Sequence, residues 1–128
     1  QNGQTVVEEL WYNEKVRVQH GSAVRVGETI YASSGHGPAF LTAVTVKTGE
    51  ITTQQRGFGK ANLIMAGNQM IILDEAGQLA IINANPNSFE VLAQAQVLTS
   101  RSWTAPTLAG TKLYLRDMKE ILALDLSP

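Results

Sequence analysis

The residues that could do chemistry are few in this chain of 128 residues, and none stands in a recognisable catalytic arrangement. The two histidines, His20 and His36, have no Ser or acidic partner at the spacing of a catalytic triad. Asp74 and Glu75 supply two carboxylates in one turn, whereas Ca²⁺ takes six to eight oxygen ligands. The run GFGK at 57–60 lacks the spacing of a phosphate-binding loop. We therefore expect no catalytic residue, no metal site and no cofactor.

The composition narrows the class of protein further. The formal net charge is -1 and the pI is about 6.1, which gives no electrostatic reason to expect a nucleic-acid partner. There is no Cys, so disulfides, thiolate nucleophiles and Cys-based metal sites are absent. The apolar runs are too short to span a bilayer. The sequence starts at Gln1 without Met, and we expect a processed product or a piece of something longer.

One phrase recurs three times and predicts the architecture. The segments VGETIYASS at 26–34, AGNQMIILD at 66–74 and AGTKLYLRD at 109–117 place their glycines 40 and then 43 residues apart. The surrounding segments match as well, and each unit reads as three or four short strands with alternating apolar and polar residues. A period of about 40 to 45 residues with four strands per unit is typical of a β-propeller blade. We predict an all-β fold of about three four-stranded antiparallel blades.

The expected blades run at about 20–57, 58–98 and 99–128, within a single propeller segment. The third blade lacks a fourth strand, while residues 5–13 supply a spare one before the first blade. This strand either completes the last blade or is the end of a preceding blade. In the second case we expect another chain to complete the last blade. Three blades are too few to close a ring. We expect either a part of a larger ring or a homo-oligomer in which two chains make six blades; a monomer is the least expected state.

The third strand of each unit carries a family resemblance. The family's repeat is Ala-x-Asp-x-x-Thr-Gly, followed by Trp. The matching positions here are Ala43, Thr48 and Gly49 in the first unit, Ala80 in the second, and Ala123 and Asp125 in the third. Thr45 and Thr53 replace the Asp and the Trp of the first unit, and Trp11 is the candidate for a surviving outer-strand Trp. The chain resembles the pyrroloquinoline-quinone-like (PQQ-like) β-propellers of bacteria over nearly its whole length.

The resemblance implies a function more loosely than a fold. The family includes dehydrogenases and an outer-membrane assembly lipoprotein. Its dehydrogenases use a vicinal disulfide, a Ca²⁺ ion and a catalytic Asp, whereas this chain has no Cys and three blades cannot enclose the quinone. The resemblance thus implies a non-enzymatic binding or assembly scaffold in the periplasm or outside the cell, whose partners are proteins or further blades. The alternatives are a fragment or inactive relative of a PQQ-dependent dehydrogenase, and a binder of small ligands or carbohydrate.

The repeat also aligns a set of candidate binding residues. Seven positions before the three turn glycines stand His20, Lys60 and Trp103, with Arg101 shortly before the last. These positions begin the innermost strand of each blade, at one mouth of the central channel of a propeller. Arg and Trp are frequent anchors of binding hot spots. We predict a site for a ligand or partner at His20, Lys60, Arg101 and Trp103. The alternative is that Trp103 packs between blades while His20 and Lys60 are merely exposed.

Overall fold

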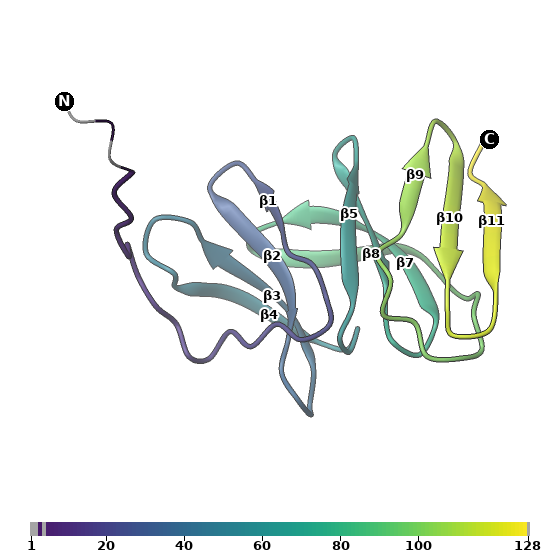
Figure 1. Cartoon of the computed structure of the whole chain (residues 1–128), viewed down its shortest axis with the longest axis horizontal. Helices are drawn as coiled ribbons and strands as arrows, with labels where there is room; N and C mark the ends of the chain where they lie inside the picture. Colours follow the sequence, from purple (N-terminus) through teal and green to yellow (C-terminus); the bar gives the residue numbers. More distant parts are fainter. Residues whose placement is uncertain (1–2, 4, 128) are drawn as a thin grey trace.

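The computed structural model describes residue 3 and residues 5–127, and its strands form three antiparallel sheets (Figure 1). The first sheet contains β1 (Val24–Val26), β2 (Thr29–Ser34), β3 (Phe40–Thr45) and β4 (Ile51–Arg56) in that order. The second contains β5 (Asn62–Ala66), β6 (Gln69–Leu73), β7 (Gln78–Asn85) and β8 (Ser88–Gln96). The third contains β9 (Thr107–Ala109), β10 (Lys112–Arg116) and β11 (Ile121–Asp125). The predicted all-β fold of about three blades is confirmed, and we call the sheets the first, second and third blades.

The three repeated glycines explain the sharp turns inside the blades. Gly27, Gly67 and Gly110 open the turns that join the first two strands of each blade, with φ of 57°, 62° and 59°. Side chains other than Gly rarely adopt this left-handed conformation because their Cβ meets the following carbonyl. A Cβ at any of the three would meet no atom within 4 Å, so the requirement is conformational rather than steric.

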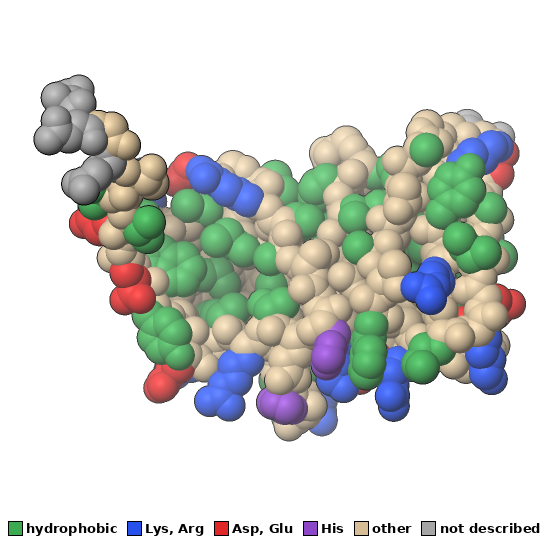
Figure 2. Space-filling model, viewed as in Figure 1, with side chains coloured by type: hydrophobic (Ala, Val, Ile, Leu, Met, Phe, Trp, Pro, Cys, Tyr) green, Lys and Arg blue, Asp and Glu red, His purple; other side chains and the backbone are tan. Residues whose placement is uncertain are grey.

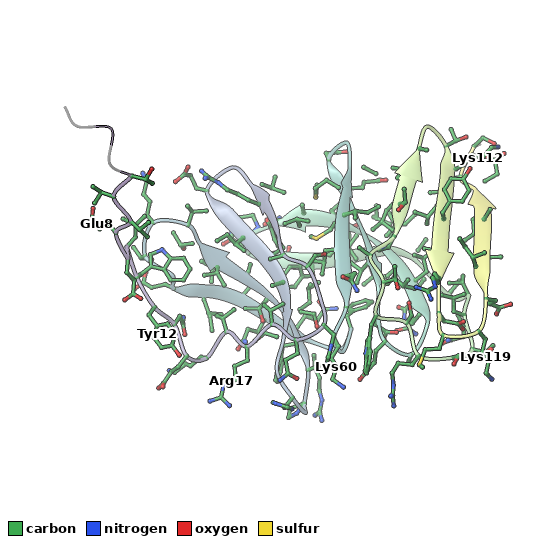
Figure 3. The ribbon with its side chains drawn as sticks, viewed as in Figure 1. Glu8, Tyr12, Arg17, Lys60, Lys112 and Lys119 are labelled. Atoms are coloured by element: carbon green, nitrogen blue, oxygen red, sulfur yellow. The ribbon has the colours of Figure 1, made fainter. Side chains whose placement is uncertain are left out.

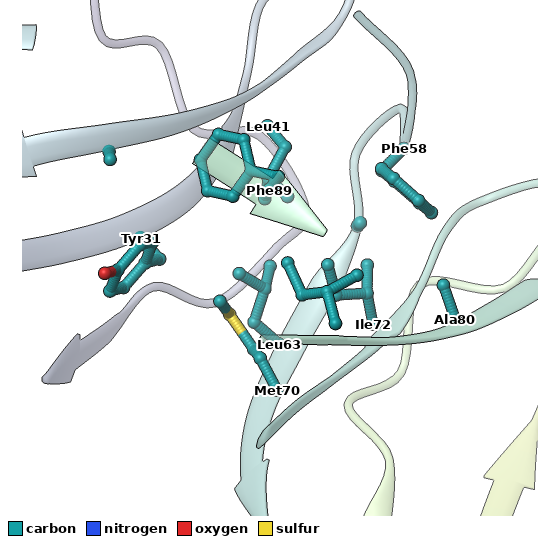
Figure 4. Packing of buried hydrophobic residues seen from close by; sticks show 11 residues of the cluster. Tyr31, Leu41, Phe58, Leu63, Met70, Ile72, Ala80 and Phe89 are labelled. Atoms are coloured by element: carbon teal, nitrogen blue, oxygen red, sulfur yellow. The ribbon is translucent and has the colours of Figure 1, made fainter. Parts of the chain in front are cut away.

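The second blade is buried on both faces because it lies between the other two. Along β6, Met70 and Ile72 belong to the core shared with the first blade (Figure 4), while Ile71 and Leu73 belong to the core shared with the third. This explains why its sequence is a continuous apolar run rather than an alternation. In β10, by contrast, Leu113 and Leu115 are buried while the intervening residues are exposed. The third blade is therefore packed on one face only.

The N-terminal segment differs from our prediction. Residues 5–13 form no strand, and the far edge of β11 has no neighbouring strand among the described residues. The segment lies against the first blade instead, at the opposite end of the molecule from β11 (Figure 1). Trp11 Nε1 donates to the carbonyl oxygen of Val46 at 2.7 Å, and Asn13 Nδ2 donates to that of Gly49 at 2.6 Å. The Trp11 ring occupies the place where a Cβ on Gly49 would stand, so these anchors replace strand pairing within the chain.

No helix in the part of the chain that the structure describes is long and apolar enough to cross a membrane.

Candidate functional site: a cluster where the three blades meet

The structure brings the four predicted site residues into one cluster. His20, Lys60 and Trp103 lie on the segments that lead into β1, β5 and β9. The His20 and Trp103 rings stack with their centroids 4.3 Å apart and their planes 9° from parallel. Arg101 places its guanidinium carbon 4.9 Å from the centroid of the Trp103 ring. Residues from all three blades therefore meet at one place, which we call the junction cluster.

Glu75 joins the cluster and was not among the predicted residues. Lys60 Nζ donates to Glu75 Oε1 at 3.0 Å and to Oε2 at 2.9 Å, and Trp103 Nε1 donates to Oε2 at 3.2 Å. The Glu75 carboxylate thus links the segment that leads into the second blade to the segment that leads into the third blade. The turn between β6 and β7 lies at the same end of the blade as these segments, because each antiparallel strand reverses the direction of the chain. The sequence feature that could have identified Glu75 is its position directly after the turn residue Asp74. The repeat alone does not single out this residue.

The backbone around the cluster is held by its own hydrogen bonds. Glu75 donates its N–H to the carbonyl oxygen of Gly59 at 3.0 Å and accepts the N–H of Ser102 at 3.0 Å. His20 and Lys60 have φ of 54° and 47°. Such left-handed conformations cost about 1 kcal/mol or more and persist where the surrounding structure enforces them. The same unusual backbone thus recurs at the same position of two repeats, and it fixes where both side chains stand.

The charge of Glu75 is maintained by its neighbours. Burial favours its neutral form, but the hydrogen bonds from Lys60 and Trp103, together with the positive charges of Lys60 and Arg101, outweigh this and hold the pKa of Glu75 below its ordinary value. The carboxylate is therefore ionised at neutral pH and is shared between an ammonium and an indole. A group committed in this way organises the cluster rather than acting as an acid or a base.

Two further carboxylates at this end of the blades, those of Asp74 and Asp117, are parts of turns. Asp74 Oδ1 accepts the N–H groups of Ala76 and Gln78, both at 2.9 Å. Asp117 stands at the matching turn of the third blade, where Oδ1 accepts the N–H groups of Lys119 and Glu120. These bonds give both carboxylates a structural role in their turns. Within the described residues, no group of three or more His, Asp or Glu side chains is placed to hold a metal ion.

The remaining histidine lies outside the junction cluster. His36 is exposed in the turn between β2 and β3, and its Nε2 lies 2.7 Å from the side-chain nitrogen of Gln19. That turn is at the same end of the first blade as His20, but the structure records no contact between the two histidines.

A shallow pocket adjoins the junction cluster. It has a volume of about 180 Å³ and is lined by Arg101, Trp103, Thr104, Arg116, Asp117 and Met118. Met118 is 71% exposed and Trp103 is 39% exposed, so the pocket offers apolar surface together with two arginine side chains. Asp117 on its wall is engaged in its own turn, so the side chains that remain for a ligand are Arg101, Trp103, Thr104, Arg116 and Met118.

Comparisons with known proteins relate the chain to other proteins by fold. No known family matches its sequence, and no curated protein matches it. By structure it resembles 43 chains. One is BamB from Moraxella catarrhalis, with a TM-score of 0.60 and 16% identity, over 79% of this chain and 29% of that chain. This chain is a partial β-propeller. It spans less than a third of the length of that BamB chain, and at this identity the likeness shows the fold alone.

Proposed function

We propose that this chain is a non-enzymatic binding or assembly scaffold of the PQQ-like β-propeller type, forming a single propeller segment over residues 1–128. The observation that supports this most is the junction cluster. It gathers His20, Lys60, Arg101 and Trp103 from three blades, leaves Arg101 and part of Trp103 exposed, and adjoins a pocket. Arg and Trp on a rigid frame are the side chains that most often dominate binding energy. By the same resemblance, we propose a periplasmic or extracellular location.

Affinity capture with matched variants tests the binding role. The tagged chain is compared with Arg101→Ala, with Trp103→Ala, and with Lys112→Ala, which changes a side chain at the opposite end of the third blade. A protein retained by the parent chain and by Lys112→Ala, but lost from both junction variants at unchanged circular dichroism, supports the proposal. Retention by all three variants contradicts it. Unfolding of both junction variants would assign these residues to structure alone.

A cofactor titration tests the non-enzymatic part of the proposal. Pyrroloquinoline quinone is added to the purified chain with Ca²⁺, and its absorbance spectrum is followed. We expect no saturable spectral change, because the sequence has no Cys and, among the described residues, no group of carboxylates is placed to hold Ca²⁺. A saturable change would favour the alternative function, a fragment or relative of a quinone-dependent dehydrogenase.

The third blade supports a proposal about partners. The outer edge of β11 has no strand beside it among the described residues, and Ile121 on this strand is 74% exposed. Unpaired strand edges bind further strands readily. We propose that this edge is covered by a strand of further blades or of a second copy of the chain.

A further inference from the structure

We propose that the end of the blades that carries the junction cluster binds an acidic polypeptide segment. This end, the junction end, holds the turns between the second and third strands of each blade and the segments that connect one blade to the next. The proposal rests on the proposed scaffold function and adds the chemical class of the partner. It is carried by charge, by ion pairing and by the pocket beside Trp103.

Positive side chains are concentrated at the junction end. Figure 2 shows most of the Lys and Arg side chains, with the histidines, along the lower edge of the molecule, and Figure 3 labels Arg17, Lys60 and Lys119 there. Hydrogen bonds between segments that are distant in sequence bring this end together, such as Arg17 N–H to Ser34 Oγ at 2.9 Å. The cationic residues of this end are Arg17, Arg56, Lys60, Arg101, Arg116 and Lys119. The chain as a whole is not basic, so the charge is segregated rather than general.

The two ends of the blades differ in how their cations are paired. At the far end, Arg25 pairs with Glu28 at 3.3 Å and Lys47 with the same carboxylate at 3.9 Å. Lys112 there pairs with Asp125. At the junction end, Lys60 is bonded to Glu75, whereas the other five cations form no ion pair within the described residues. Their charge is therefore available to a partner.

The acids of the junction end do not cancel this charge. Asp74 and Asp117 are buried and accept backbone N–H groups in their turns. Glu75 is held by Lys60 and Trp103. Two acids are left exposed, Glu120 beside β11 and Glu14 three residues before Arg17. The five cations without an ion pair outnumber these two acids, so the exposed surface at this end carries net positive charge and attracts anionic groups over a Debye length of about 10 Å at moderate salt.

The pocket favours a polypeptide over a polyphosphate. Arg101 and Arg116 stand on its wall beside Trp103 and the exposed thioether of Met118. Guanidinium groups bind carboxylates through paired hydrogen bonds, and the apolar wall suits a neighbouring apolar side chain. Single-stranded nucleic acids are bound on several stacked aromatic side chains, whereas this end offers one indole, which is already stacked on His20. An acidic segment that contains an apolar residue satisfies both parts of the pocket.

Anisotropy of labelled probes tests the proposal on the whole chain. The probe is a short synthetic peptide of Glu residues with one central Phe, and the comparison probes are its Lys counterpart and oligodeoxythymidylate. We expect the Glu peptide to bind at low salt, more tightly than oligodeoxythymidylate, and to weaken as salt rises. The double variant Arg101→Gln/Arg116→Gln should lose about tenfold or more in affinity, since it removes both guanidinium groups that would bind the carboxylates of the peptide.

The control makes the same change of charge at the far end. Arg25→Gln/Lys112→Gln should leave the affinity for the Glu peptide within about twofold, because these cations already have acidic partners and are distant from the pocket. An equal loss in both double variants, no binding of the Glu peptide at low salt, or tighter binding of oligodeoxythymidylate would each overturn the proposal. If affinity capture shows a partner at the junction cluster while the Glu peptide does not bind, the scaffold function stands and the acidic class fails.

Discussion

Two aspartates at equivalent turns of the second and third blades differ in how their ionisation affects the stability of the fold. Burial raises the pKa of Asp74 and outweighs the backbone hydrogen bonds from Gln78 and Ala76, which act to lower it. Backbone hydrogen bonds from Lys119, Glu120 and Ser100 lower the pKa of Asp117, although burial opposes them. Ionisation of Asp74 therefore weakens the fold as pH rises from about 4 through the raised pKa of this carboxyl. Asp117 has the opposite effect, and its contribution is lost as pH falls below about 4.

The same turn therefore predicts opposite effects of one substitution. Asp74→Asn retains Oδ1, which accepts both N–H groups, and removes the buried charge, so we expect an unchanged or higher Tm at pH 7. Asp117→Asn places an amide N–H where Oδ2 accepts the Ser100 N–H at 2.9 Å, so we expect a Tm lower by several degrees. Thermal unfolding followed by circular dichroism compares the two. A lower Tm for Asp74→Asn than for Asp117→Asn would contradict this account of the turns.

The pair between Lys112 and Asp125 provides a second check on the electrostatics. The hydrogen bond from Lys112, with further bonds from Ser127 and Thr111, lowers the pKa of Asp125 to about 2. Its stabilising contribution is thus present at pH above about 4 and is lost as pH falls toward 2. We expect Lys112→Gln to return this pKa toward its ordinary value, as measured by carboxyl chemical shifts in an NMR titration. An unchanged titration would show that the pair does not form in solution.

Glu75 separates the structural role of the junction cluster from its binding role. Glu75→Gln removes the charge shared by Lys60 and Trp103, so we expect a lower Tm. The same change adds net positive charge to the junction end, so the folded variant should bind the Glu peptide more tightly than the parent chain. The two measurements thus move in opposite directions. Weaker binding by a folded Glu75→Gln would show that the carboxylate itself contacts the partner.

At the scale of the elements, glycine positions distinguish conformational from steric requirements. Gly27 has φ of 57° with open space around a Cβ, whereas a Cβ at Gly77 would overlap the backbone of Leu98. The repeated sequence phrase predicted the turn at Gly27. The closeness of Gly77 to Leu98 arises from the path of the chain after β8, which the repeat does not encode.

Alanine at these two positions should therefore differ in cost. Gly27→Ala should lose about 1 to 2 kcal/mol of stability, the strain of a left-handed residue with a Cβ. Gly77→Ala carries the same strain with φ of 83° and adds the steric overlap, so it should lose clearly more. Urea unfolding measures both free energies. Equal losses would show that the segment around Leu98 relaxes without cost.

The sequence predicted the blades well and the N-terminal segment poorly, for a physical reason. Strand alternation and turn glycines are local signals, and they predicted the all-β fold of about three antiparallel blades that the structure has. Residues 5–13 are rich in β-branched and aromatic side chains, but a strand needs a neighbour, and the open edge of β11 lies at the other end of the molecule. Trp11 and Asn13 find bonding partners on the first blade instead. The junction cluster followed the same division. The repeat aligned His20, Lys60 and Trp103, and Arg101 was added as a neighbour in sequence, whereas Glu75 is brought to the cluster by the fold.

At the scale of the whole molecule, the third blade presents one bare face and one open edge. Tyr114 and Ile121 are exposed on this blade, and neither belongs to the core shared with the second blade. If copies of the chain cover this surface, light scattering should show a mass near twice 13.8 kDa that returns to 13.8 kDa in Ile121→Lys. A mass of 13.8 kDa at every concentration would contradict pairing between copies.

The central claim is that the junction end, and not the far end, meets the partner. Cross-linking of lysines followed by mass spectrometry tests it most directly, because Lys60 and Lys119 stand at the junction end while Lys47 and Lys112 stand at the far end. The cross-linking is applied to the complex obtained by affinity capture. We predict cross-links from Lys119 and Lys60 to the partner, and we predict that the variant Arg101→Gln/Arg116→Gln loses them. Cross-links confined to Lys47 and Lys112 would contradict the account.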